Sequence, residues 1–215
     1  MDPKQLVEGL ILYLTLLILL TFHEFGHAWT AWKCGDDTAK SQGRVSLNPM
    51  VHIDLIGTVL LPLIMIFASP AIGGFLVGWA KPVPVDPSKL RNRKVDDILV
   101  TLAGPGMNLI LAVALLGLAR IGAVSGLAGM EEVCKDGAHL SLLLCFFNLL
   151  PIPPLDGSQV ARVLIGMSYE TYYQIARYGI FILIVALQIP FVTQALSVVT
   201  LTSYAVISGW MGLAV

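Results

Sequence analysis

Charged side chains are scarce in this chain. Lys, Arg, Asp and Glu together make up 13% of its 215 residues, whereas hydrophobic residues make up 56%. Soluble domains carry about 25% charged residues, so the composition excludes an ordinary soluble domain. Mean hydropathy is +0.81, and several stretches reach the ~20 apolar residues needed to cross a bilayer as a helix. We therefore expect an all-α integral membrane protein with about five to six transmembrane helices.

Three further absences narrow the class of protein. The net charge is -1, and no basic stripe interleaved with aromatic residues is present, which argues against a nucleic-acid partner. The three cysteines, Cys34, Cys134 and Cys145, have no CxxC spacing and predict no disulfide framework. Internal repeats are lacking, and no separate soluble domain fits between the apolar stretches. We expect a single membrane-embedded domain over residues 1–215, surrounded by the lipid bilayer.

One apolar stretch is interrupted. Residues 55–79 contain Gly57, Pro62, Pro70 and the pair Gly73 and Gly74, and the sequence continues as GWAKPVPV. This pattern predicts a re-entrant or β-hairpin-like element around residues 55–85 instead of a simple crossing. The other expected helices cover residues 6–32, 97–120, 137 to the prolines at 151–154, 171–189 and 191–213.

The segment His23-Glu24-Phe25-Gly26-His27 carries the strongest chemical signal. On a helix, positions i and i+4 share one face, so the two imidazoles can bind one metal ion with the acid beside them. The alternative is a hydrogen-bonded histidine pair. However, a long apolar run precedes the motif, and a charge within a membrane helix costs at least ~2.5 kcal/mol. This cost favours a bound cation, and the motif predicts a zinc site.

A catalytic zinc site needs a third protein ligand. Asp156 is the best candidate because it follows a helix broken at residues 151–154, where non-helical backbone at membrane depth needs polar surroundings. The other options are His139 at a helix start and His52 and Asp54 at an interface. Asp156 could instead act as the N-cap of the next helix.

A shared metal ion constrains the topology. His23 lies 17 residues after the start of its span at Leu6, a rise of about 26 Å, so it is near the far face of the membrane. Asp156 also follows nearly a full span from Gly137. The two segments should therefore run parallel with an odd number of crossings between them, so residues 55–79 should not cross.

Basic residues then place the site near the cytoplasmic face of a multi-pass protein, in the plasma membrane of a prokaryote. Ten Lys and Arg residues lie on the side of the site and three on the other, as the positive-inside rule requires. The ten are Lys33, Lys40, Arg44, Lys81, Lys89, Arg91, Arg93, Lys94, Arg162 and Arg177, and the three are Lys4, Arg120 and Lys135.

Several motifs together resemble a known family. The HEFGH segment, the Ala103-Gly104-Pro105 sequence and the segment NLLPIPPLDG at residues 148–157 resemble the site-2 proteases, membrane-embedded metallopeptidases of peptidase family M50. The resemblance extends over essentially the whole chain. The GWAKPVPV stretch is similar to the compact bacterial and archaeal members, and there is no room for a PDZ or CBS domain.

The resemblance implies a zinc-dependent intramembrane endopeptidase. It implies that one Zn²⁺ per chain is held by His23, His27 and Asp156, that Glu24 is the catalytic base, and that Asn148 is the active-site asparagine. The implied substrate is a transmembrane protein, hydrolysed in or near its membrane-spanning segment by a zinc-activated water.

Alternatives remain at this point. Asn148 could donate a hydrogen bond to the substrate or cap carbonyls freed beside Pro151. Gly73, Gly74 and His52 could bind an extended substrate, the glycines by β-augmentation, although an interfacial structural role for His52 is also possible. The competing functions are a metal-ion transporter, which predicts paired repeats, and an inactive scaffold with a closed four-ligand site.

Overall fold

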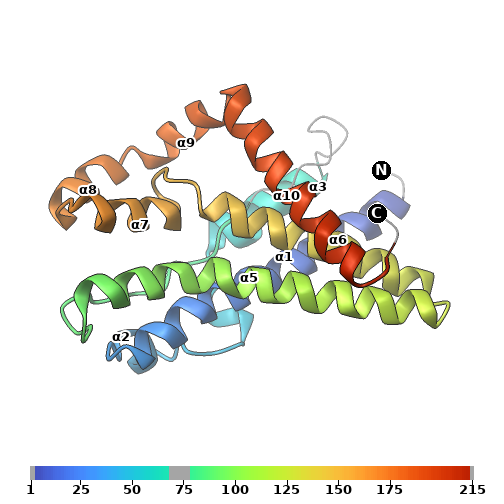
Figure 1. Ribbon diagram of the computed structural model, residues 1–215, viewed down its shortest axis with the longest axis horizontal. Coiled ribbons are helices and arrows are strands. Elements are labelled where there is room, and N and C mark those ends of the chain that lie inside the picture. The colour runs from blue at the N-terminus through green and yellow to red at the C-terminus, as the bar shows by residue number, and fades with distance from the viewer. Residues whose placement is uncertain (1–2, 68–77, 214–215) are drawn as a thin grey trace.

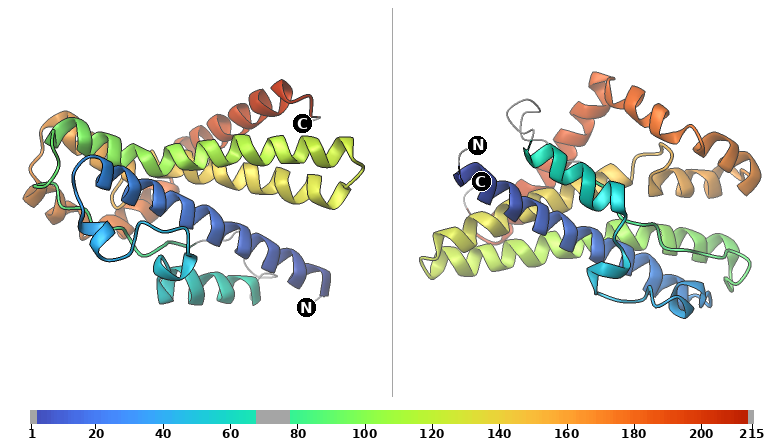
Figure 2. Two further views of the ribbon diagram at one scale, coloured as in Figure 1. Left: turned by 90° about the horizontal axis from the view of Figure 1, so that it is seen from below. Right: turned by 180° about the vertical axis from the view of Figure 1, so that it is seen from behind.

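The computed structural model describes residues 3–67 and 78–213, and within them the only regular elements are helices. Three long helices form the core: α1 (Pro3–Lys33), α5 (Arg93–Val124) and α6 (Ala128–Asn148). α5 packs against both α1 and α6. α1 and α6 run in the same direction and α5 runs in the opposite one (Figures 1 and 2), as the shared-metal argument predicted.

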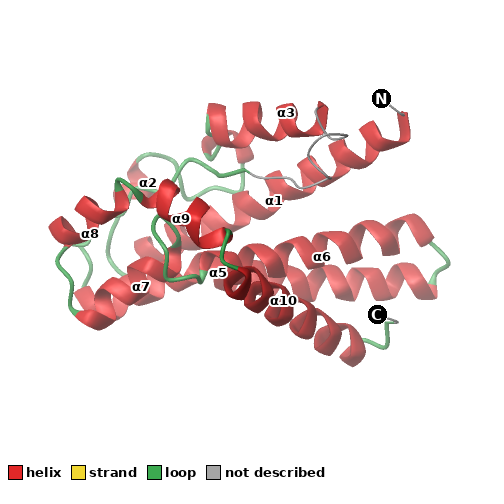
Figure 3. Cartoon of the chain, turned by 90° about the horizontal axis from the view of Figure 1, so that it is seen from above, coloured by secondary structure: helices red, strands yellow, loops and turns green. Residues whose placement is uncertain are grey.

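The remaining elements are short except for the last. α7 to α9 extend from the end of α6, and α10 returns to pack against α6 (Figure 3). Their bounds are α2 Thr38–Ser41, η1 Pro49–Val51, η2 Leu55–Leu60, α3 Leu61–Phe67, α7 Asp156–Ile165, α8 Tyr169–Ala176, α9 Gly179–Leu187 and α10 Pro190–Trp210.

Small residues allow the core helices to approach one another closely. A Cβ added at Gly26 of α1 would lie 2.7 Å from the carbonyl oxygen of Ala103 in α5. Ala112 of α5 and Ala138 of α6 are fully buried in the cluster that also holds Leu116 and Leu142. Such contacts are the usual basis of helix association in lipid, and the contact at Gly26 brings the C-terminal half of α1 against the Gly-Pro region of α5.

Three of the described helices are long and apolar enough to cross a membrane, namely α1, α5 and α10. The described residues are therefore all-helical, and the chain has the composition of a multi-pass membrane protein. α6 has 21 residues, but its first turns are polar and contain the ion pair between Lys135 and Glu131, 2.8 Å apart. Five to six crossings stay a prediction.

Two expected helices have different limits in the structure. α6 begins at Ala128, nine residues before the expected start near Gly137, because hydropathy marks lipid contact while a polar sequence can equally be helical. The expected span over residues 171–189 is divided into α8 and α9. The break lies at residues 177–178. At the next residue, Gly179, a Cβ would lie 2.8 Å from the backbone of Pro153, so the start of α9 packs on the proline-rich loop.

Residues 55–85 contain a short helical segment. Asp54 caps η2, a π-helix of six residues, by accepting hydrogen bonds from the amides of Ile56 and Gly57 at 3.1 and 2.7 Å. With the seven residues of α3, the described part of this helical segment is about 20 Å long. Pro70, Gly73 and Gly74 lie outside the described residues, so the re-entrant element stays a prediction.

Candidate metal centre

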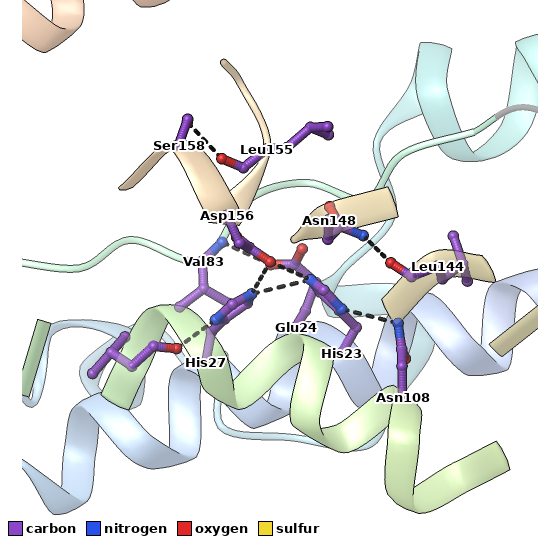
Figure 4. A network of polar contacts seen from close by, with 11 residues as sticks. His23, Glu24, His27, Val83, Asn108, Leu144, Asn148, Leu155, Asp156 and Ser158 are labelled. Carbon is purple, nitrogen blue, oxygen red and sulfur yellow. Dashed lines mark hydrogen bonds and ion pairs between the residues drawn. The ribbon is translucent and has the colours of Figure 1, made fainter. Parts of the chain in front are cut away.

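Three side chains from two helices meet at one point. His23 and His27 lie on α1, and Asp156 is the first residue of α7 (Figure 4). The Nε2 atoms of the two histidines are 3.1 Å apart, and the Asp156 Oδ2 atom is 3.1 Å from the first and 3.4 Å from the second. Two ligands at 2.0–2.2 Å from one tetrahedral zinc ion lie about 3.3 Å apart. The three atoms therefore have the spacing of zinc ligands.

The surroundings of these atoms also fit a cation. His23 and His27 are 5% and 9% exposed. Apart from the two imidazoles, the buried Oδ2 atom of Asp156 has no polar partner. Within residues 3–67 and 78–213, no other three His, Cys, Asp or Glu side chains come together in this way. The donor set, two imidazoles and one carboxylate, is that of several zinc hydrolases.

Gly104 of α5 makes room for the two rings. A Cβ at this position would collide with the Nε2 atoms of both His23 and His27. Position 104 therefore requires glycine, because any side chain would displace the two imidazole rings.

The backbone of α5 orients His27. Its Nδ1 atom lies 2.7 Å from the carbonyl oxygen of Val100. A carbonyl only accepts a hydrogen bond, so Nδ1 carries the ring proton and the lone pair of Nε2 faces His23 and Asp156. An outer hydrogen bond of this kind is typical of metal-binding histidines.

A buried charge network ties α7, and with it Asp156, to α5. The Arg162 guanidinium of α7 forms an ion pair with Asp97 of α5 and lies 3.8 Å from the ring centre of Tyr169. The Tyr169 hydroxyl donates to Asp97 over 2.8 Å. Burial and the Asp97 carboxylate raise the pKa of Tyr169, so this hydroxyl stays protonated and donates.

Asp156 does not cap α7. The N-cap residue of α7 is Leu155, without a side-chain capping bond, and the Asp156 carboxylate turns toward the histidines (Figure 4). Gly157 allows this turn, because a Cβ there would collide with the Leu149 carbonyl oxygen. The N-cap alternative is therefore not the observed arrangement.

Glu24 lies beside the three ligand residues. Its Oε2 atom accepts a hydrogen bond from the amide of Val83 over 2.9 Å (Figure 4). Val83 belongs to the segment 78–85, which has no regular secondary structure and in which the amide of Lys81 donates to the carbonyl oxygen of His52. The buried guanidinium of Arg44 donates to the carbonyl oxygens of Lys81 and Pro82. The segment thus fixes one oxygen of the Glu24 carboxylate.

Asn148 and His52 have structural contacts. The Asn148 side chain, at the end of α6 beside the site, donates to the carbonyl oxygen of Leu144 over 2.9 Å (Figure 4). His52 is 2% exposed, and its Nε2 atom lies 2.8 Å from the carbonyl oxygen of Ser46. The predicted substrate-binding residues Gly73 and Gly74 lie outside the described residues.

The residues that hold the site in place could not be identified from the sequence. The roles of Val100, Gly104, Asp97 and Arg162 depend on contacts between distant parts of the chain. Gly104 stood out in the sequence only as part of the Ala103-Gly104-Pro105 motif. Asp97 gave a signal because it begins an apolar stretch and a buried charge needs a partner.

Together, the fold and the site describe a helical protein with three helices apolar enough to cross a membrane, and with two histidines and one aspartate placed so that they could hold a metal ion. The sequence profile of peptidase family M50 matches residues 11–125 and 123–187. The chain belongs to this family and is a metalloprotease.

The names of two curated relatives also describe zinc metalloproteases. The chain is 37% identical over 198 residues to "Putative zinc metalloprotease YwhC" of Bacillus subtilis, covering 87% of this chain and 84% of that protein. It is 37% identical over 142 residues to "Putative zinc metalloprotease Rip2" of Mycolicibacterium smegmatis, covering 66% of this chain and 52% of the relative. No solved structure gave a significant match.

Proposed function

We propose that this protein is a zinc-dependent intramembrane endopeptidase that hydrolyses transmembrane proteins in or near their membrane-spanning segments. One zinc ion per chain would be held by His23, His27 and Asp156. The observation that carries the proposal is the 3.1–3.4 Å spacing of the three ligand atoms on and beside α1, a helix long and apolar enough to span a membrane.

The proposed reaction assigns proton transfer to Glu24. Zinc, when bound, supplies Lewis acidity that makes a water nucleophilic near neutral pH and polarises a peptide carbonyl. The Val83 amide holds Oε2 of Glu24, which leaves Oε1 to take the proton of the attacking water. Glu24 then returns this proton to the leaving amine as the C–N bond breaks.

Asn148 is proposed to assist at the substrate carbonyl. Its side-chain amide now donates to Leu144 at the end of its own helix. A small rotation would let it donate to the substrate oxygen as negative charge develops there, a contribution known from oxyanion holes.

The proposed location of the site is the cytoplasmic side of the membrane. α1 ends at the basic residue Lys33 close to the histidines, and ten of the thirteen Lys and Arg residues lie on this side under the proposed topology.

A catalytic role fits the site better than the two alternatives. A transporter would use ligands strung along a pathway and paired repeats, whereas the described ligands form one compact group. A structural zinc site is closed by four protein ligands. In the described parts of the chain the group has three, with Glu24 beside it.

The test is cleavage of a single-span membrane protein in liposomes by wild type and the Glu24→Gln variant at equal zinc content. We expect a loss of at least ~100-fold for this variant. Glu8→Gln is the matched control because Glu8 lies on the same helix and is exposed. Equal cleavage by Glu24→Gln and wild type would contradict the mechanism, and zinc transport without cleavage would favour the transporter.

A further inference from the structure

A buried amide of α5 faces the other ligand histidine. Asn108 is fully buried, and its Nδ2 atom lies 3.1 Å from Nδ1 of His23 (Figure 4). Its Oδ1 atom is buried without any hydrogen-bond partner. Buried acceptors without a partner are rare, so an unused acceptor on a side chain that touches a ligand histidine requires a reason.

The tautomer of His23 supplies this reason. A neutral imidazole carries one proton, and binding a cation through Nε2 requires that proton to sit on Nδ1. In the observed orientation Asn108 presents a donor to Nδ1, which places the proton on Nε2. Nε2–H then points at Oδ2 of Asp156, 3.1 Å away.

A half turn of the Asn108 amide places its acceptor, in place of its donor, beside Nδ1 of His23. Turning Asn108 about its last side-chain bond exchanges Oδ1 and Nδ2, because the two ends have nearly the same shape. The side-chain carbonyl then accepts from Nδ1–H of His23, and the lone pair of Nε2 points at Asp156 and His27. The amide can therefore complement His23 with or without a cation.

We propose that Asn108 is a positioning residue for zinc binding, whose side-chain carbonyl accepts the Nδ1 proton of His23 and so leaves Nε2 free for the metal. The inference rests on the zinc site of the proposed function. Under this proposal α5 supplies a hydrogen-bond acceptor for the Nδ1–H group of each histidine. The acceptor is the Asn108 side chain for His23 and the Val100 carbonyl for His27.

Two substitutions separate this role from packing. Asn108→Leu keeps a similar volume and removes both polar ends. Asn108→Asp presents an acceptor in either orientation, as in the carboxylate–histidine–zinc arrangement. Ser141→Ala is the matched control, because the buried Ser141 hydroxyl donates to the main-chain oxygen of Asn108 over 2.7 Å and does not touch His23.

The measurement is the zinc dissociation constant, from competition with a chelator, of each full-length variant in lipid nanodiscs. Thermal unfolding of the metal-free proteins is measured in parallel. We expect Asn108→Leu to bind zinc about 10- to 100-fold more weakly, and Asn108→Asp to stay within about threefold of wild type. Ser141→Ala should bind zinc like wild type.

Three results would overturn the proposal: unchanged zinc affinity in Asn108→Leu, an equal loss in Asn108→Asp, or an equal loss in Ser141→Ala. A role in packing alone would lower the metal-free melting temperature of Asn108→Leu and leave its zinc affinity intact.

If Asn108→Leu does not fold, the Asn108→Asp variant decides by itself, since loss of its zinc affinity contradicts an acceptor role. Wild type that binds no zinc would refute the proposed function as well, whereas zinc binding without peptide cleavage would refute the protease activity alone.

Discussion

Replacing Gly104 by alanine should remove the metal centre while leaving the helix bundle folded. The new Cβ would overlap the Nε2 atoms of His23 and His27. Both rings belong to α1, which is held against α5 by the close contact at Gly26. The rings can therefore avoid the new Cβ only by rotating, which moves their Nε2 atoms apart from Asp156. The ligand geometry therefore has to change.

The size of the effect follows from opposing contributions. Alanine is a better helix former than glycine by about 1 kcal/mol, which stabilises α5. A misplacement of about 1 Å costs about 100-fold in the rate of a catalysed reaction. We expect a displacement of the ligand atoms to lower zinc affinity by at least the same factor, or about 2.8 kcal/mol. The variant should therefore fold but bind zinc weakly.

Gly106 provides the matched control for this prediction. It lies two residues further along α5, and a Cβ there meets no atom within 4 Å. Gly106→Ala should bind zinc like wild type and unfold at an equal or higher temperature. Zinc affinity is measured by chelator competition and folding by circular dichroism. Wild-type zinc affinity in Gly104→Ala would refute the steric account of the site.

Three further predictions concern the surroundings of the site. Asp97→Asn should destabilise the protein by about 3–5 kcal/mol because Arg162 becomes a buried charge without a charged partner. The double variant Asp97→Asn, Arg162→Met should recover most of the lost stability. A denaturation cycle that shows additive effects would contradict this coupling. Gly157→Ala should weaken zinc binding, measured by chelator competition, because its Cβ would collide with Leu149; unchanged affinity would contradict it. Burial lowers the pKa of His52, so the folded state resists a proton that the unfolded chain takes up near pH 6.5, and stability should fall as pH decreases through that value. His52→Gln should lack this component in thermal melts compared at pH 5.5 and 7.5, and an identical pH dependence in the two proteins would count against it.

The sequence predicted those parts of the site that depend on local spacing. Two histidines four residues apart on a helix share a face, whatever the rest of the chain does. The parallel course of α1 and α6 also followed from sequence, because a shared ligand point fixes the relative depth of two segments. Local geometry and the length of a membrane span were sufficient for both.

Contacts between distant segments could not be predicted in this way. Asp97 and Arg162 are 65 residues apart, and Val83 and Glu24 are 59 residues apart. Their pairing depends on how the loops return to the bundle, and local sequence patterns do not determine that. The early start of α6 shows a related limit, because hydropathy identifies lipid contact and not the end of a helix.

X-ray absorption spectroscopy at the zinc edge tests most directly whether Asp156 completes a zinc site with His23 and His27. The zinc-loaded protein should contain one zinc ion per chain with only nitrogen and oxygen neighbours at about 2.0–2.2 Å, including imidazole. Asp156→Asn should lose the ion or bind it far more weakly. A sulfur neighbour at about 2.3 Å, or an unchanged spectrum and affinity in Asp156→Asn, would contradict the account.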